Sequence, residues 1–267
     1  MNNMNMNKII NNKNNKINKK TLIELIQVRK QMSIPHPMKQ YYNNIIPLNI
    51  FQTWHSKTLP PLMYAATVKL KNANPRFNYQ LYDDNDCREF IKNNFEGKVL
   101  YAYDKLIPGA FKADLWRYCI LFKYGGVYLD IKYVPMKGFK LINLLEKEHF
   151  CLDADNNGIY NAIMVCVPGN IILSNAINQI VENVKHNYYG GSCLDVTGPG
   201  LLSRYFSREQ KDSLDLKHKY YISLDYRYIL YNNYYIFKSY PGYISEHSHF
   251  QKVEHYTGLW GKRQIYN

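Results

Sequence analysis

The 267-residue chain lacks any run of eighteen consecutive apolar residues, so no membrane-spanning helix is expected. Its most apolar segment, AIMVCVPGNIIL, is interrupted by Pro168, Gly169 and Asn170. The first twenty residues, MNNMNMNKIINNKNNKINKK, lack the apolar core of a signal peptide. The five cysteines are scattered and form no CxxC pair, which argues against a zinc site or a disulfide framework. These absences predict a protein of a reducing, cytoplasmic compartment.

Acidic residues are also scarce, since 21 Asp and Glu stand against 34 Lys and Arg, a net charge of +13. Residues 1–42 contain eight Lys or Arg and one Glu, so this part carries over half of the excess. Elsewhere the basic residues are dispersed, and a mildly basic domain also suits an anionic small substrate such as a nucleotide diphosphate. No nucleic-acid partner is therefore expected. The many Asn, Lys, Ile and Tyr residues are typical of an AT-rich genome, such as that of a microbe or a giant virus.

Composition divides the chain into a low-complexity basic tail with a short helix, residues 1–44, and a folded domain, residues 45–267. Residues 1–20 are an Asn/Lys tract and are predicted to be disordered. The segment Thr21–Met32 has apolar residues at helical spacing, and two prolines follow it.

Strand-like and helix-like segments alternate through the domain. LNIFQTW and RFNYQLYDD read as strands, each followed by a helix, and Asp84 or Asn85 is expected to cap the second of these helices. GAFKADLWRYCILFKYGG reads as a helix closed by a glycine pair, VYLDI and NAIMVCV as strands, and NIILSNAINQIVENV as a helix. The alternation predicts an α/β fold with a mainly parallel central sheet flanked by helices. Ligands of such sheets bind outside the carboxyl ends of the strands, where Asp130 lies.

Two charged pairs lie near this predicted end. Asp130 and Lys132 face one side together if the strand continues that far, although an edge strand ending in a solvated ion pair has the same pattern. Asp114 and Arg117 are three residues apart on one helical face, as in any ordinary ion pair, but their neighbours are apolar. Buried charges need partners, and polar groups of a ligand are one source of them.

The segment GAFKADLWRYCILFKYGGVYLDIK resembles the sugar-binding region of glycosyltransferase family 32. This family includes yeast Golgi mannosyltransferases and is related to the glucosylating domains of large clostridial toxins. The shared pattern is an acidic residue, two residues, an Arg, then Tyr-Gly-Gly-(Ile/Val)-Tyr-x-Asp-x-Asp. Upstream, IPLNIFQTW and NPRFNYQLYDD match as well, and NAIMVCVPGN, TGPG and HYTGLWGK match more faintly. The resemblance implies a GT-A-like fold and retaining transfer of a hexose from a UDP- or GDP-linked donor to a glycan or protein acceptor.

The resemblance also implies roles for individual residues. Trp54 would stack on the nucleotide base, and Asn161 would lie near the sugar. Asp114 and Arg117 would hold the sugar hydroxyls, with Arg117 also near the leaving phosphate. Asp130 would reach the ribose or a metal ion. The C-terminal segment with His255 and Trp260 would close over the diphosphate, with His255 as a metal ligand.

Lys132 departs from the family pattern, which has a second Asp here to bind a divalent metal such as Mn²⁺ or Mg²⁺. A charged lysine cannot bind a metal, but it can act on a phosphate as a point charge. Lys132 therefore either replaces part of the metal's work or turns aside and leaves a metal to Asp130 and His255. A third alternative is an inactive relative that only binds nucleotide-sugars or glycans, and a basic nucleic-acid-binding protein is the least favoured reading.

Three further segments have structural interpretations. YDDND (residues 82–86) reads as a strand end with a helix cap rather than a calcium loop. TGPG (residues 197–200) reads as a turn before a helix. HSH (residues 247–249) is expected to place two histidines on one face of a strand.

Overall fold

The structure is a computed structural model that describes residues 19–221, 226–250 and 253–267. The chain divides into two units, one up to Ile34 and one from Pro35 to Asn267. The first unit contains helix α2 (Lys19–Met32), so the helix expected at Thr21–Met32 is present. Most of the tract predicted to be disordered, residues 1–18, lies outside the described residues. No helix of the described ranges is long and apolar enough to cross a membrane.

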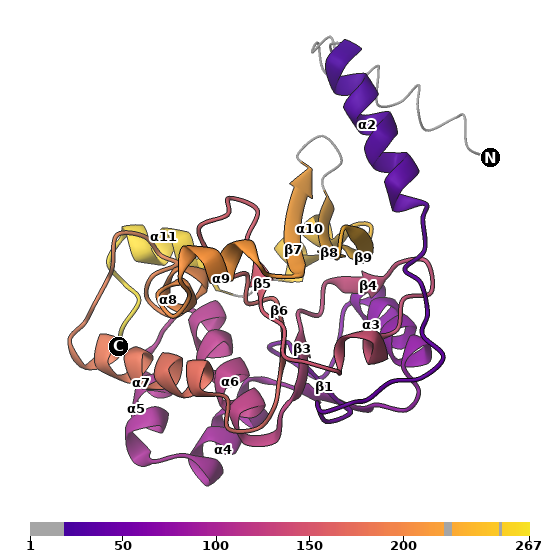
Figure 1. The fold of residues 1–267 in the computed structure, drawn as a ribbon. Coiled ribbons are helices and arrows are strands. Elements are labelled where there is room, and N and C mark those ends of the chain that lie inside the picture. Colours follow the sequence, from indigo (N-terminus) through magenta and orange to yellow (C-terminus); the bar gives the residue numbers. More distant parts are fainter. Residues whose placement is uncertain (1–18, 222–225, 251–252) are drawn as a thin grey trace. The chain divides into compact units, whose positions relative to one another are not determined.

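The second unit is built on a four-stranded sheet whose middle strands are parallel (Figure 1). Only the last strand of this sheet runs antiparallel to its neighbour. The predicted α/β fold with a mainly parallel central sheet flanked by helices is therefore confirmed. In spatial order the strands are β2 (Asn78–Tyr82), β1 (Asn49–Thr53), β3 (Gly126–Leu129) and β6 (Ile163–Cys166).

A second sheet of five short strands, which the sequence did not predict, packs beside the first. Its strands pair antiparallel, except that β5 and β7 are parallel. In spatial order they are β4 (Tyr133–Pro135), β9 (Tyr234–Ser239), β8 (Tyr226–Tyr231), β7 (Leu216–Tyr221) and β5 (Cys151–Leu152).

Helices follow the strands in the order that the sequence indicated. The longer ones are α3 (Pro61–Ala73), α4 (Asp84–Asn94), α5 (Gly97–Lys105), α6 (Gly109–Tyr124) and α7 (Ile171–Lys185). Shorter ones are a 3₁₀ turn (Leu141–Leu144), α8 (Pro199–Ser203), α9 (Arg208–Asp212), α10 (Tyr243–Phe250) and α11 (Tyr256–Gly261).

Two details of the helices correct the sequence interpretation. The residue that caps α4 is Asp83, not Asp84 or Asn85, because its carboxylate accepts from the Asp86 amide 2.9 Å away. The Asp86 carboxylate in turn accepts a hydrogen bond from the Asp83 amide, and the two bonds form a capping box. The HSH segment lies in helix α10 rather than in a strand, so the strand face expected for its histidines is wrong.

Side chains of the central sheet are buried on both faces. Phe51, Tyr128 and Met164 pack into a core formed with α4 to α7, whereas Ile50 and Val127 point to the second sheet. This alternation follows from the two-residue period of a strand. Because both faces are covered, polar ligands can approach the sheet only at its strand ends.

The turn from α6 into β3 depends on two glycines, as the predicted left-handed cap requires. Gly125 has φ +60° and Gly126 has φ +119°. A Cβ atom on Gly126 would lie 2.7 Å from the Cβ and 2.8 Å from the backbone oxygen of Asn49 on β1. This close approach fixes β3 against β1 and thereby sets where Asp130 lies.

Gly126→Ala is expected to lower the free energy of unfolding by about 1–3 kcal/mol or more, because the left-handed backbone and the Asn49 clash add. Gly97→Ala is the matched control: no atom lies within 4 Å of its added Cβ, and it is expected to gain about 0.4–1 kcal/mol. Urea unfolding of both variants measures the difference. Equal stabilities would contradict this account of the turn.

Candidate active site

The candidate site lies where β3 ends, beside the start of its antiparallel neighbour β6. Asp130 follows β3 directly, and its amide donates to the Ala162 carbonyl oxygen 2.8 Å away. Asn161, just before β6, is thereby placed next to Asp130. Helix α6 packs against these strands and brings Asp114 and Arg117 to the same place.

Arg117 is the centre of this cluster, and its side chain is only 9% exposed. Its Nη1 donates to the Asn161 carbonyl oxygen at 3.0 Å and to Asp130 Oδ1 at 3.3 Å. Nη2 lies 3.5 Å from Asp114 Oδ1, and the guanidinium stacks on the Tyr128 ring, 4.4 Å from its centroid. One arginine therefore links both carboxylates and fixes their separation.

Asp114 accepts hydrogen bonds from two groups besides interacting with the charge of Arg117. Asn161 Nδ2 donates to Oδ1 at 2.8 Å, and Thr197 Oγ1 donates to Oδ2 at 2.7 Å. A Cβ on Gly198 would lie 3.2 Å from Oδ2, so the turn in TGPG approaches closely because it carries a glycine. Burial raises the pKa of Asp114, and the nearby Arg117 opposes that shift only in part.

Asp130 and Lys132 contact each other although β3 ends before them. Lys132 Nζ lies 2.5 Å from Asp130 Oδ2, and Tyr128 donates its hydroxyl to Oδ1 at 2.7 Å. Burial would raise the pKa of Asp130, but Lys132 and Arg117 outweigh it and lower that pKa. Burial also opposes the charge on Lys132, but Asp130 outweighs it and raises the pKa of Lys132. Both groups are therefore charged at neutral pH.

The carboxylate of Asp130 does not fit a divalent metal ion in this arrangement. Both of its oxygens already accept from donors, and the donor on Oδ2 is itself a cation. Within the described ranges, no three His, Cys, Asp or Glu side chains are grouped so that they could hold a metal. Lys132 Nζ is bound to Asp130 Oδ2, and a cation in that place repels a divalent metal.

Trp54 lies at the same strand ends but is partly covered. It packs in a small cluster that includes Ile131, next to Asp130. Its ring centroid lies 4.6 Å from that of His55 and 5.6 Å from that of His247 on α10, and its Nε1 is buried without a hydrogen-bond partner. A stacking base would therefore compete with the two imidazoles.

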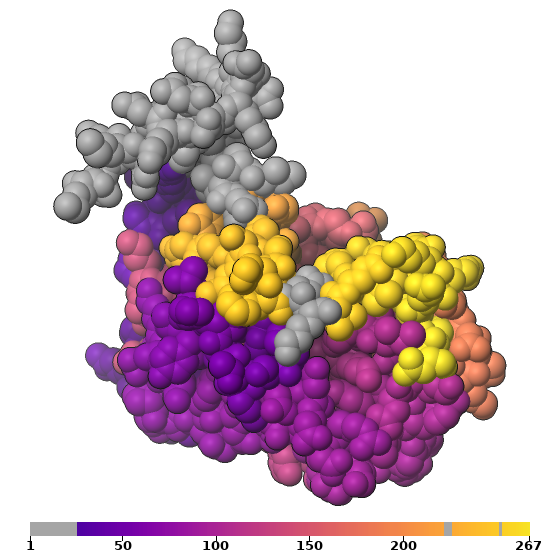
Figure 2. Space-filling model, turned by 180° about the vertical axis from the view of Figure 1, so that it is seen from behind, coloured from indigo at the N-terminus to yellow at the C-terminus, as the bar shows by residue number. Residues whose placement is uncertain are grey.

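The C-terminal segment packs against the start of α3. Figure 2 shows the C-terminal residues in yellow as two areas, one over the indigo and purple residues and the other over magenta residues. Glu246 of α10 accepts from the amides of Leu62 and Met63 at 2.8 and 2.9 Å, at the start of α3. Helix α10 is thus fixed at a helix N-terminus, where a carboxylate is favoured.

His255 and Trp260 make contacts that stabilise the fold. His255 is the exposed N-cap of α11 and hydrogen-bonds Thr257. Trp260 Nε1 donates to the Tyr189 carbonyl oxygen at 2.7 Å, and its ring packs on the helical core. No hydrogen bond or ion pair that the described residues make joins either one to Asp130 or Arg117, so their donor-binding roles stay predictions.

The sequence interpretation missed three members of the site. Tyr118 accepts from Asn161 Nδ2 at 2.8 Å and donates to the Thr197 carbonyl oxygen at 2.9 Å. Tyr128 and Thr197 bind the two carboxylates directly. Tyr118 lies one helical turn after Asp114, which was a usable signal, whereas Thr197 had only its place in TGPG.

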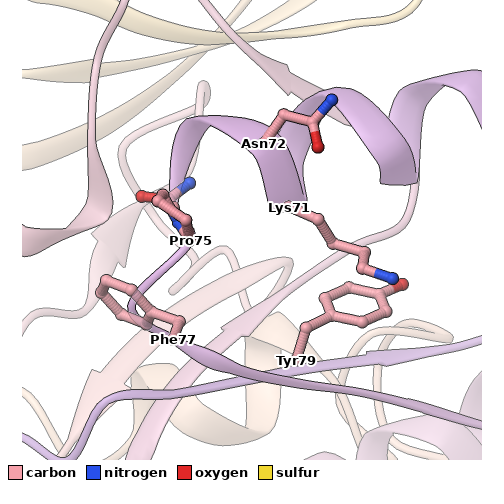
Figure 3. A pocket seen from close by; sticks show the side chains of 6 residues that line it. Lys71, Asn72, Pro75, Phe77 and Tyr79 are labelled. Carbon is pink, nitrogen blue, oxygen red and sulfur yellow. The ribbon is translucent and has the colours of Figure 1, made fainter.

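A separate pocket lies at the opposite strand ends. Lys71, Asn72 and Pro75 at the end of α3 line it together with Phe77 and Tyr79 (Figure 3). Tyr79 is near the start of β2, whereas Asp130 follows the end of β3. Because these strands run parallel to β1, the pocket and Asp130 lie at opposite ends of the strands. The pocket contains no member of the charged cluster.

The charged cluster coincides with a known sequence region. Residues 60–151 match the model of the glycosyltransferase sugar-binding region containing a DXD motif. Over these residues the chain is similar to DXD-type glycosyltransferases. The resemblance seen in the sequence is thereby confirmed, and the segment it aligned with DXD reads Asp130-Ile131-Lys132 here.

Several glycosyltransferases are similar to this chain. Inositol phosphoceramide mannosyltransferase 3 of Schizosaccharomyces pombe is 30% identical over 66% of this chain and 49% of its own length. An uncharacterized glycosyltransferase, L373, of Acanthamoeba polyphaga mimivirus is 31% identical over 43% of this chain and 36% of its own length. The chain thus spans about half or less of these relatives. The solved structure of the PaToxG glycosyltransferase superimposes with a TM-score of 0.49 at 16% identity, covering 71% of this chain and 77% of that one.

Proposed function

We propose that this glycosyltransferase moves a hexose from a UDP- or GDP-linked donor to a hydroxyl group of a glycan or protein, with retention of anomeric configuration. The observation that carries the proposal is the buried cluster of Asp114, Arg117, Asp130, Lys132 and Asn161 within and beside the matched sugar-binding region. Several relatives are named mannosyltransferases, which makes mannose the first hexose to test. The cytoplasmic location expected from the sequence stays a prediction.

The chemistry breaks the bond between the anomeric carbon and the diphosphate oxygen, and the electron pair leaves with the diphosphate. The acceptor oxygen then bonds to the anomeric carbon from the same side, and its proton passes to the leaving diphosphate. The sugar becomes oxocarbenium-like in the transition state, so stabilising the leaving charge lowers the barrier. Arg117 and Lys132 are the two cations of the cluster and would supply this stabilisation, and Asp114 would hold donor hydroxyls. Trp54 would stack on the base, and the segment of His255 and Trp260 would close over the diphosphate.

We further propose that Lys132 takes the place of the metal. Two carboxylates and a divalent cation sum to no net charge, and so do Asp130 and Lys132 without a metal. Asp130 then orients the ammonium rather than an ion, while Lys132 contacts the leaving diphosphate as a point charge. This reading agrees with the hydrogen bonds that satisfy both Asp130 oxygens.

The test is donor hydrolysis by the purified protein across UDP- and GDP-sugars, including GDP-mannose. Wild type is expected to release nucleotide diphosphate from one of them, and Asp114→Asn to lose that turnover. Asp104→Asn, which alters a surface carboxylate paired with Arg88, is the matched control and is expected to keep it. Nucleotide binding without turnover of any donor, alone or with sugar acceptors, would instead favour an inactive binding relative.

A further inference from the structure

A second polar cluster lies on the face of the antiparallel sheet, outside the network around Arg117. His218 of β7 is 7% exposed, and its Nδ1 lies 2.8 Å from Asp153 Oδ1. The His218 ring stacks on Tyr160 with centroids 3.8 Å apart and planes 2° apart. Tyr160 in turn shares a hydrogen bond of 2.8 Å with the hydroxyl of Tyr133. These contacts hold the imidazole in one orientation.

The remaining nitrogen of His218 is an unused hydrogen-bond acceptor. Burial lowers the pKa of His218, and Asp153 offsets that shift only in part, so the ring is neutral at pH 7. Asp153 accepts a hydrogen bond, which places the proton of the neutral ring on Nδ1 and leaves a lone pair on Nε2. Nε2 is buried and has no hydrogen-bond partner. A buried polar atom left in this state costs stability, which points to a missing donor.

Arg227 presents a complementary atom on the same face of the sheet. The register pairs His218 with Ile229 and Tyr220 with Arg227, so His218 and Arg227 point to one side. The guanidinium lies over the Tyr220 ring, 4.9 Å from the centroid, and its Nη1 is buried without a partner. One unused acceptor and one unused donor on a common face match neighbouring hydroxyl groups, since each hydroxyl both donates and accepts.

This face adjoins the candidate donor site through two consecutive residues. Asn161 hydrogen-bonds Asp114, while Tyr160 before it stacks on His218. Lys132 Nζ lies 5.5 Å from the Tyr160 ring centroid and 5.3 Å from that of Tyr133. A group bound at His218 is therefore one aromatic ring away from the lysine assigned to the leaving diphosphate.

We propose that His218 and Arg227 form the acceptor subsite, with His218 Nε2 accepting a hydrogen bond from a hydroxyl of a sugar or other polyol. Asp153 is the positioning residue that sets the imidazole tautomer. The proposal rests on the proposed function for the meaning of "acceptor", because the subsite is defined relative to the donor. Nε2 is buried, so an entering polyol must displace neighbouring side chains.

The first test measures polyol binding at His218 and does not require turnover. Protein with ¹⁵N-labelled histidine is titrated with methyl α-D-mannopyranoside and with myo-inositol, in the presence and absence of UDP or GDP. A hydroxyl donating to Nε2 is expected to shift the His218 Nε2 resonance saturably, while the exposed His186 stays unchanged. In Asp153→Asn the Nδ1–H tautomer signature and the response to the probe are both expected to weaken. A His218 resonance that neither probe moves would overturn the proposal.

The second test separates this subsite from the donor site. His218→Gln is expected to reduce transfer to the probe polyol by about ten-fold or more, as for loss of one buried hydrogen bond, with donor hydrolysis to water nearly unchanged. Equal loss of both reactions would overturn an acceptor role. Wild-type protein that hydrolyses no donor but shows the His218 response would refute the proposed function and leave a polyol site standing.

Discussion

Arg117→Ala is expected to lower the free energy of unfolding by about 3–5 kcal/mol and to abolish donor turnover, because one side chain compensates the buried carboxylate of Asp114 and the partly buried one of Asp130. Without it, Asp114 and Asp130 face each other with Lys132 as the remaining neighbouring cation of the cluster. The Asn161 carbonyl oxygen also loses its donor at 3.0 Å. Urea unfolding measures the first effect, and release of UDP or GDP the second.

The control for this prediction is Arg88→Ala. Arg88 also bonds a carboxylate, with Nη2 2.7 Å from Asp104 Oδ2, but it lies on the surface. Water replaces its contacts, so stability and turnover are expected to change little. If the two variants lost similar stability, the burial of Arg117 would not be the reason for its importance.

The fold was predictable wherever a local pattern sufficed. Helix α6 was predicted from twelve or more helix-compatible residues closed by a glycine pair, and its C-cap is at Gly125 as expected. The second sheet was missed although YNNYY carried a signal: Asn232 and Asn233 both have positive φ, as a tight hairpin turn between β8 and β9 requires. The HSH segment was misread because a short, mixed stretch has no clear period, and packing of α10 on α3 decides its form.

The site was predictable in its ion pairs and not in its hydrogen-bond partners. Spacing alone put Asp114 beside Arg117, and strand ends put Asp130 near them. Thr197 lies 83 residues from Asp114 and His218 lies 65 residues from Asp153, so no local pattern in the sequence could join these partners. The Lys132 contact was predicted for a continuous strand, whereas a turn after Leu129 produces it. The contact is the same, but the reason is different.

Lys132→Met is expected to reduce donor turnover by about 10²–10³-fold, the usual cost of removing one group that stabilises charge in the transition state. Met keeps the length of the side chain but removes the charge, so Asp130 loses the donor on Oδ2 and the diphosphate loses a cation. If Lys132 takes the place of the metal as proposed, wild-type turnover is expected to be the same with Mn²⁺ and with EDTA. Initial rates of donor hydrolysis under both conditions measure this.

Lys132→Asp makes the complementary variant, because it creates the Asp-x-Asp pattern that the family uses for a metal. With the ammonium gone, Oδ2 of Asp130 is free, and the two carboxylates would together hold a divalent cation that supplies the missing positive charge. Turnover of Lys132→Asp is therefore expected to be negligible in EDTA and to recover in part with Mn²⁺, unlike that of Lys132→Met. Wild-type turnover that requires Mn²⁺ and survives Lys132→Met would show that Lys132 turns aside from the diphosphate and that the metal does the work here too.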